Sequence, residues 1–274
     1  MELLRRFFFR LYNSTQSRKA SRALLKAAKA GDQEQYLALV ANYINLAQAY
    51  LGSSFAEAQE SRLQRSEAVF INLWKRLRYA ERLSDFEFML AQALLDCAET
   101  DNTSVFSQEP LVTKLRLLEP TTRLAILAYE FEKWPLRFAA LVLRMRPGAL
   151  HRMLSEARCE LCGISWESLA KEERQFLVVI SEAMDKCPNV RANMAMAEKI
   201  CDYPKVTEIK AMWLELRPQL VEVRHRYIPE QDEREQLLGQ IFERTRETEM
   251  QRPAMMDRVV NSVHFSRHGI SKVS

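Results

Sequence analysis

The chain has 274 residues, of which only six are Gly and nine are Pro. Because Gly usage averages about 7%, the chain is short of the turn residues that an all-β sandwich needs. Hydrophobic residues make up 47% and charged residues 28% of the sequence, a balance that excludes disorder along the whole length. The length fits one or two domains of roughly 100 to 200 residues each.

The net charge of +4 is distributed unevenly. Residues 1–30 carry eight Lys and Arg against the single acid Glu2, and residues 111–162 carry nine against five acids. We expect both segments to face an anionic partner such as a phosphate backbone. The apolar side of the N-terminal arm fits either packing on the protein body or binding to a membrane surface. No stretch approaches 18 apolar residues and no signal peptide is evident, so we expect a cytoplasmic protein without integral membrane association.

Helical periodicity runs through most of the chain and predicts an all-α fold. A basic helix from residue 20 stops near Gly31, and Asp32 caps the next helix, which we expect to end at Gly52 with Ser53-Ser54. A third helix begins near Phe55, and Asp85 caps a fourth over residues 86–98. After Pro110, short helices begin near Pro residues, because Pro suits the first turn of a helix. We expect helix breaks near four later Pro residues: Pro188, Pro204, Pro218 and Pro229.

Composition divides the chain into segments. Residues 99–110 are polar and aperiodic, which is typical of a linker. We therefore expect the following organisation: a basic N-terminal arm (1–30), a helical domain (31–98), a linker (99–110), a second helical domain (111–162), a helical C-terminal extension (163–250) and a flexible tail (251–274).

Residues 136–161 have the spacing of a helix-turn-helix. That motif needs a small residue where the helices cross, a turn residue four positions later and an apolar anchor six positions after that. Ala140, Arg144 and Leu150 stand at these offsets. The second helix would bury Leu150, Leu154, Ala157 and Leu161, and its outer side and start would face DNA. The candidate DNA-binding residues are Arg146, His151, Arg152, Ser155 and Arg158.

The same stretch resembles region four of extracytoplasmic-function sigma factors. The motifs are Leu118-Glu-Pro120-x-x-Arg123, a helix ending in Glu130, an apolar run before Arg144, Gly148-Ala-Leu150 and Ala157-Arg158. Upstream, residues 31–36, 69–74 and 86–96 resemble successive parts of region two of that family, in the same order. The resemblance covers about residues 22–162. It implies two sigma-like helical domains, the second with a helix-turn-helix.

The sequence departs from the family pattern at three places. Residues 64–67, Gln-Arg-Ser-Glu, stand where the family has an acidic segment that engages the polymerase clamp. Met89 and Asp96 replace residues of the promoter-melting helix, which leaves little for unpaired bases to stack on. Arg144 replaces the turn Gly, so we expect a left-handed Arg at a cost on the order of 1 kcal/mol.

The resemblance implies a transcription-initiation or regulatory protein with core RNA polymerase, promoter DNA and a regulatory protein as partners. The alternative is a degenerate sigma-like scaffold that binds proteins without promoter recognition. The resemblance does not reach residues 163–274. Their amphipathic, Met-containing helices fit either an extension that completes the core or an appended domain that masks the DNA-binding or polymerase-binding face.

Enzyme motifs are missing: the sequence has no Gly-rich phosphate loop, no H-E-x-x-H and no G-x-S-x-G. Five Cys are an odd number for a disulfide framework. The C-x-x-C of Cys159 and Cys162 lacks a second pair at zinc-binding spacing. We therefore expect no catalytic residue, no cofactor and no metal site, and we place both Cys at the end of a helix.

Overall fold

A computed structural model describes residues 18–55, 59–99, 109–132, 134–185 and 203–248. The described residues form α-helices and short 3₁₀ turns and no strand, so the all-α prediction is confirmed for them. Most of the N-terminal arm, most of the expected linker and the whole expected tail lie outside the described residues.

The described residues of the N-terminal half, 18–55 and 59–99, form five α-helices. They are α2 (Arg18–Lys29), α3 (Gln33–Ala41), α4 (Ile44–Ser54), α5 (Gln59–Arg76) and α6 (Leu83–Glu99). Gly31 adopts φ +96° after α2, and the Asp32 carboxylate accepts the Gln35 N–H at 3.0 Å, as the sequence predicts. The single helix expected between Asp32 and Gly52 is wrong, because backbone bonds of Asn42 and Tyr43 to residues three positions back end α3 there.

The middle of the chain forms four shorter helices. They are α7 (Pro110–Leu117), α8 (Pro120–Glu130), α9 (Leu136–Val142) and α10 (Pro147–Leu161). Pro120 and Pro147 occupy the first turns of their helices and Pro135 caps α9, so the prediction from these three residues is confirmed. Gly163, with φ +80°, ends α10.

The C-terminal third adds α11 (Lys171–Asp185), α13 (Pro204–Tyr227) and a helix over residues 231–248. The break expected at Pro218 is wrong, because this residue lies inside α13. The carbonyl that Pro218 leaves without its usual N–H donor belongs to Leu214, whose residue is 51% exposed, so solvent can approach that turn.

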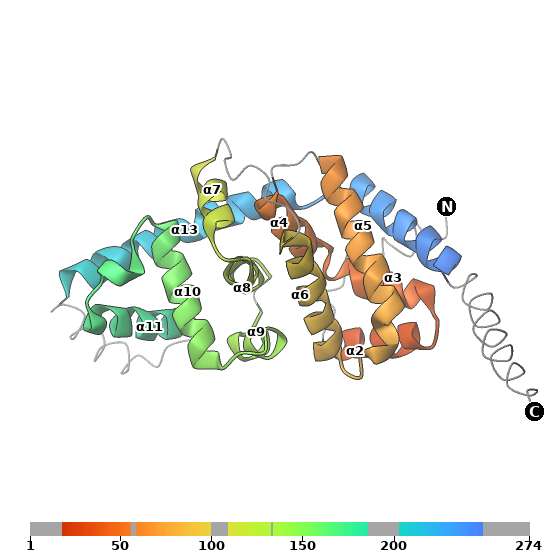
Figure 1. Cartoon of the computed structure of the whole chain (residues 1–274), viewed down its shortest axis with the longest axis horizontal. Coiled ribbons are helices and arrows are strands. Elements are labelled where there is room, and N and C mark those ends of the chain that lie inside the picture. The colour runs from red at the N-terminus through yellow and green to blue at the C-terminus, as the bar shows by residue number, and fades with distance from the viewer. Residues whose placement is uncertain (1–17, 56–58, 100–108, 133, 186–202, 249–274) are drawn as a thin grey trace, which may run out of the picture.

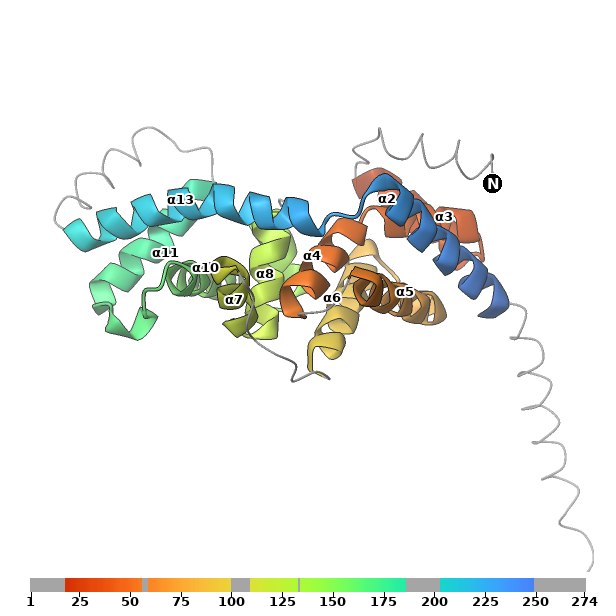
Figure 2. The ribbon, with the colours of Figure 1, turned by 90° about the horizontal axis from the view of Figure 1, so that it is seen from above.

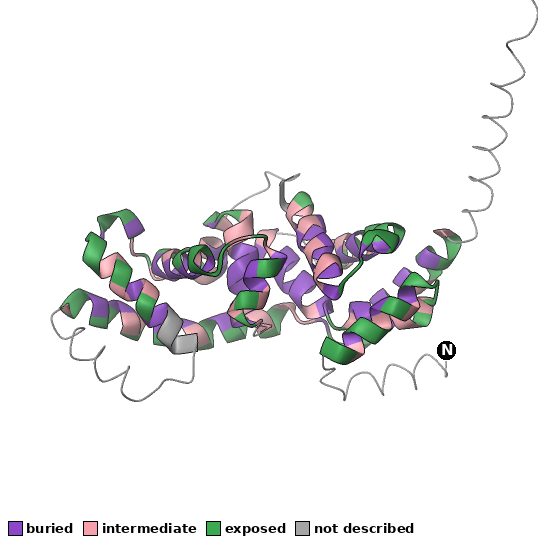
Figure 3. Ribbon diagram, turned by 90° about the horizontal axis from the view of Figure 1, so that it is seen from below, coloured by how far each residue is buried: buried purple, intermediate pink, exposed green. Residues whose placement is uncertain are grey.

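The helices on both sides of the expected linker share one hydrophobic cluster, which includes Leu51 and Leu94 from one side and Leu124 and Leu154 from the other. Contacts of α8 with α4 and α6 join the two sets at the middle of the molecule (Figure 1). The buried residues concentrate there (Figure 3). The expected division at residues 99–110 therefore stays a prediction, while the flanking helices pack as neighbours.

The last two helices run along the rest of the protein. Figure 2 shows α13 passing from α11 and α10 to α4, and residues 231–248 continuing beside α3. Leu237, Leu238 and Ile241 enter the shared cluster, while Trp213 belongs to a second cluster with Trp166 and residues of α11. Burial of these side chains fixes the C-terminal third on the body through apolar contact.

Candidate nucleic-acid interface

The predicted turn between α9 and α10 forms around Arg144, whose φ is +52°. The N–H of Met145 donates to the carbonyl of Ala140 at 2.9 Å, and the N–H of Arg144 donates to that of Leu141 at 3.2 Å. These paired bonds are typical of a helix end with a left-handed residue. The left-handed conformation expected of Arg144 is confirmed.

A contact with α6 holds this turn in place. The guanidinium of Arg144 lies 3.7 Å from the ring centroid of Phe88. A cation on an aromatic face contributes about 0.5 to 1 kcal/mol at an exposed site, which is comparable with the cost of the left-handed backbone. The Arg side chain therefore offsets the strain that its own backbone creates.

The inner side of α10 is the predicted one. Leu150, Leu154, Ala157 and Leu161 are buried, and so is Ala140 where α9 meets α10. These residues belong to the shared cluster with α8. The apolar periodicity therefore placed this helix correctly against its partner.

The outer side of α10 differs from the prediction. Arg146 and Arg152 are exposed, together with Pro147, Gly148 and Ala149 at the start of the helix. The expected outward orientation of three candidate residues is wrong: His151, Ser155 and Arg158 are buried, with exposures of 5%, 0% and 2%. The exposed part of α10 is thus its N-terminal half.

Helices from the C-terminal third cover the rest of α10. Both α11 and α13 contact it, and Cys159 of α10 packs with Leu177 and Trp213 in the second cluster. The Ser155 hydroxyl donates to the carbonyl of His151 at 2.8 Å and needs no solvent. The prediction failed because it assumed one buried side and one exposed side of α10, whereas other helices pack against α10 on more than one side.

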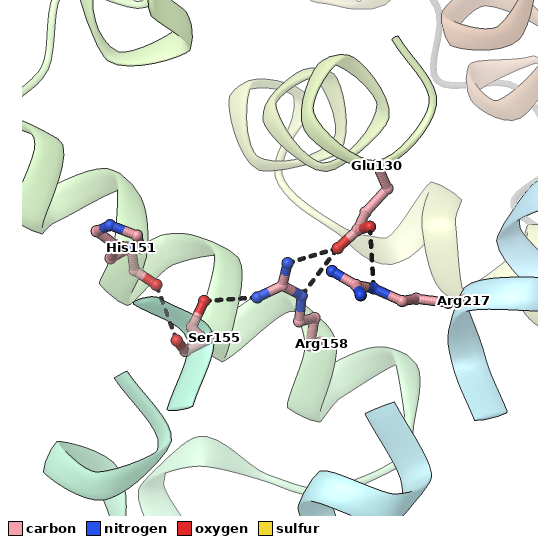
Figure 4. Close-up of polar contacts among 6 residues, drawn as sticks. Glu130, His151, Ser155, Arg158 and Arg217 are labelled. Atoms are coloured by element: carbon pink, nitrogen blue, oxygen red, sulfur yellow. Dashed lines mark hydrogen bonds and ion pairs between the residues drawn. The ribbon is translucent and has the colours of Figure 1, made fainter. Parts of the chain in front are cut away.

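The guanidinium of Arg158 is the centre of a buried polar network (Figure 4). Its Nε and Nη2 donate to Oε1 of Glu130, with the Nε bond 3.1 Å long, and its Nη1 donates to the hydroxyl of Ser181. Nε of Arg217 lies 3.6 Å from the other oxygen of Glu130. The network therefore joins α8, α10, α11 and α13.

Sequence reasoning missed the role of Glu130, Ser181 and Arg217 in this network. Glu130 ends an apolar helix, and Ser181 lies four residues after the buried Leu177 on α11. A polar residue on an apolar helix face could have indicated such a network, because a buried polar group needs a partner. The identity of that partner was not readable from the sequence.

The segment expected at the polymerase clamp also contacts the C-terminal third. On α5, Gln64 is exposed, while Ser66 is buried and accepts a 2.6 Å hydrogen bond from Nε2 of Gln48. Glu67 lies 3.5 Å from Nε of Arg244 in the helix 231–248. Two surfaces that the family resemblance selects, on α5 and α10, are therefore partly covered by one C-terminal segment.

The helix expected to hold unpaired bases offers little aromatic surface in its described side chains. Met89 is buried, Phe86 is buried and Phe88 lies under Arg144. Asp96 is exposed. Stacking of bases on this helix would require Phe88 to exchange one planar partner for another.

Cysteine chemistry is suppressed at the end of α10. Burial raises the pKa of the Cys159 thiol to about 12 and also raises the pKa of Cys162. A high pKa leaves the unreactive thiol at neutral pH. Within the described ranges, no group of three or more His, Cys, Asp and Glu side chains is placed to hold a metal ion. Cys187 and Cys201 lie outside those ranges.

Comparisons of the chain with family models, with curated proteins and with solved structures find no match. The resemblance to sigma factors therefore stays a prediction from the motifs. Among the helices that the structure describes, none is both long and apolar enough to cross a membrane.

Proposed function

We propose that this protein is a sigma-factor-like protein of transcription, which binds core RNA polymerase and uses α10 to contact promoter DNA. The observation that carries the proposal is the exposed N-terminal half of α10 with Arg146 and Arg152, after a tight left-handed turn. In helix-turn-helix proteins the N-terminal residues of the second helix contact base edges. The exposed part of α10 is the part that such docking requires.

The chemistry of the exposed residues fits DNA. Arg presents two donors to guanine or to a phosphate. Arg146 stands at the N-cap of α10 and Arg152 lies on its second turn. Arg158, by contrast, is committed to Glu130 and acts as a structural residue. The proposed DNA contacts are therefore Arg146 and Arg152, without His151, Ser155 and Arg158.

Duplex binding tests this proposal. We compare the full chain with Arg146→Gln plus Arg152→Gln, and use Lys75→Gln plus Arg76→Gln as a control that removes two exposed charges at the end of α5. Each phosphate contact contributes about 0.9 to the salt dependence of the binding constant. We expect the α10 variant to bind promoter-containing duplex more weakly and to lose up to about two units of this slope. Equal affinities of the two variants would exclude docking through α10.

A second candidate function is a sigma-like scaffold that binds proteins without recognising a promoter. The cover over α10 and the ion pair of Glu67 with Arg244 favour it, because both surfaces are occupied within the chain. It predicts a stable complex with purified core polymerase or a regulatory protein and no measurable duplex affinity at moderate salt. Binding of purified polymerase, measured with and without promoter duplex, separates the two candidates.

A further inference from the structure

A groove of about 590 Å³ lies between α2 and the start of α6, and Leu141 of α9 forms part of its edge. Its cationic lining residues are Arg18, Arg22, Lys26, Lys29 and Arg82, and Glu81 is the acid among the lining residues. Figure 1 shows α2 beside the end of α6 at which the chain enters that helix. Its volume falls within the range of ligand pockets, about 300 to 1,000 Å³.

Among the described residues, the side chains of Arg22, Lys26 and Arg82 make no hydrogen bond or close ion pair, although the charge of Arg22 acts on Glu87 from a longer distance. The other two have partners at the ends of α2. Arg18 pairs with Glu87 at 3.3 Å and stacks on the ring of Phe138, and Lys29 donates to the carbonyl of Ala80 at 2.7 Å. Lys26 and Arg82 therefore present charges to the groove that no hydrogen bond or ion pair within the described residues occupies.

The cationic row costs α2 stability. Arg18, Arg22 and Lys26 are spaced four residues apart, Lys29 follows after three, and α2 contains no Asp or Glu. Like charges at these spacings destabilise a helix by about 0.2 to 0.5 kcal/mol for each pair. An anion in the groove would remove that repulsion. The same charges therefore lower the stability of α2 and favour anion binding, which is typical of a binding site.

We propose that this groove binds a ligand that carries several phosphate groups, either a nucleotide or the backbone of a single-stranded nucleic acid. The cationic row from Arg18 to Lys29 is about 16 Å long at 1.5 Å per residue, which suits a series of phosphates better than one compact anion. Leu25, Leu83 and Leu141 line the same groove, and Leu141 is 61% exposed. Leu25 and Leu83 are buried, so Leu141 offers the apolar surface to a base or sugar beside the phosphates.

This site is separate from the contacts proposed for α10. Its cations come from α2 and from Arg82, whereas Arg146 and Arg152 belong to α10. Failure of the α10 variant to change duplex binding would leave this proposal untouched. Likewise, failure of the groove variant to change probe binding would leave the α10 proposal untouched. The two proposals can therefore be overturned independently.

The groove is tested with two labelled probes, an oligothymidylate of twelve nucleotides and a nucleoside triphosphate. Binding of each probe to the full chain is measured. The test variant is Arg22→Gln plus Lys26→Gln, and Lys75→Gln plus Arg76→Gln is the control with the same loss of charge. We expect the test variant to bind at least one probe about tenfold more weakly at 0.1 M salt, with the control unchanged. For the oligonucleotide the salt slope should fall by about 1.4, since each single-strand phosphate contact contributes about 0.7.

The two probes identify the source of the phosphates. Binding of the triphosphate, with displacement of the oligonucleotide by unlabelled triphosphate, indicates a nucleotide site. Binding of the oligonucleotide alone indicates a nucleic-acid backbone. Glu81→Gln removes the lining acid and should tighten binding of the same probe. Equal binding by the test and control variants, or binding of neither probe by the unchanged protein, overturns the proposal.

Discussion

The ring of Tyr227, at the end of α13, lies directly on Gly52 in the last turns of α4. A Cβ at residue 52 would overlap Cδ1, Cε1 and Cγ of that ring. The Arg62 guanidinium lies 5.3 Å from the centroid of the same ring. Gly52 therefore serves close packing between the C-terminal third and the N-terminal helices, and the helix end predicted at Gly52 with Ser53-Ser54 is confirmed, because α4 ends at Ser54.

We expect Gly52→Ala to destabilise the protein by about 1 to 3 kcal/mol, which is the usual cost of overpacking. The matched control is Gly239→Ala in the helix 231–248, where a Cβ meets nothing within 4 Å. There the substitution should stabilise by about 0.4 to 1 kcal/mol. Urea unfolding of both variants measures the difference. Adding Tyr227→Ala to Gly52→Ala should cost less than the sum of the single changes, and simple additivity would contradict the contact.

The buried ion pair of Arg158 with Glu130 predicts a large loss of stability when the Arg158 side chain is replaced by an apolar one. Arg158→Met leaves Glu130 buried, with Arg217 as its remaining ion-pair partner among the described residues, and breaking a buried pair in this way costs about 3 to 5 kcal/mol. Arg152→Met, on the exposed side of the same helix, should change the free energy of unfolding by less than about 0.5 kcal/mol. Adding Glu130→Gln to Arg158→Met should recover part of the loss. Equal effects of the two Arg substitutions would mean that Arg158 is not held as described.

The hydrogen bonds of Arg123 predict a graded series of stability losses for substitutions at this site. Its guanidinium donates to the Ser54 hydroxyl at 2.7 Å and to the carbonyls of Leu115, Arg116 and Leu118. Arg123→Lys should destabilise the protein nearly as much as Arg123→Met, because one ammonium cannot reach the same acceptors as the planar fork. Ser54→Ala removes a single acceptor and should cost no more than about 1.5 kcal/mol. Thermal unfolding gives the order, and rescue by Lys would contradict the network.

Glu87 predicts a pH dependence of stability. Burial raises the pKa of its carboxyl from 4.5 to about 7, although the Tyr43 hydroxyl and the Arg18 guanidinium both favour the charged form. The folded protein therefore holds this proton more tightly than the unfolded chain. The associated stability is present below pH 4.5 and is lost as the pH rises through 7. The loss amounts to at most about 3.5 kcal/mol, at about 1.4 kcal/mol for each pH unit.

Glu87→Gln is the test of this dependence. The amide keeps an oxygen for the Tyr43 hydroxyl and does not ionise. We expect the variant to become more stable than the unchanged protein as the pH rises from 4.5 to 7.5, measured by urea unfolding at each pH. Glu81→Gln, at an exposed position shortly before α6, is the control. Parallel stability curves for the unchanged protein and Glu87→Gln would contradict the raised pKa of Glu87.

Local signals in the sequence predicted most helices. Apolar periodicity, the caps and the Pro at first turns placed α2, α6, α8 and α10 within a few residues. These signals work because they act between neighbouring residues. The error at Pro218 has a different origin, since local rules read Pro as a helix end, whereas the exposed turn around Leu214 tolerates it inside α13.

The candidate DNA-binding residues also separate into features that local patterns predict and features that tertiary contacts decide. The sequence correctly predicted the inner side of α10 from the spacing of apolar residues. It also predicted the left-handed turn at Arg144, because the family resemblance places a turn Gly there. It predicted exposure for His151, Ser155 and Arg158, because spacing does not reveal that another layer of helices covers that side. Arg146 and Arg152 remain exposed, whereas Arg158 bonds to Ser181 of α11 and Cys159 packs with Trp213 of α13.

The sequence by itself determined that this protein is helical, where most helices begin, and that its positive charge gathers in two segments. Periodicity and composition suffice for these properties, because they arise from interactions over a few residues. Only the tertiary structure decided which arginines are buried, that the C-terminal third covers α10 and reaches α5, and that α2 lines a groove with α6. Those outcomes depend on contacts between residues far apart in the chain, such as Gly52 with Tyr227, which no local pattern specifies.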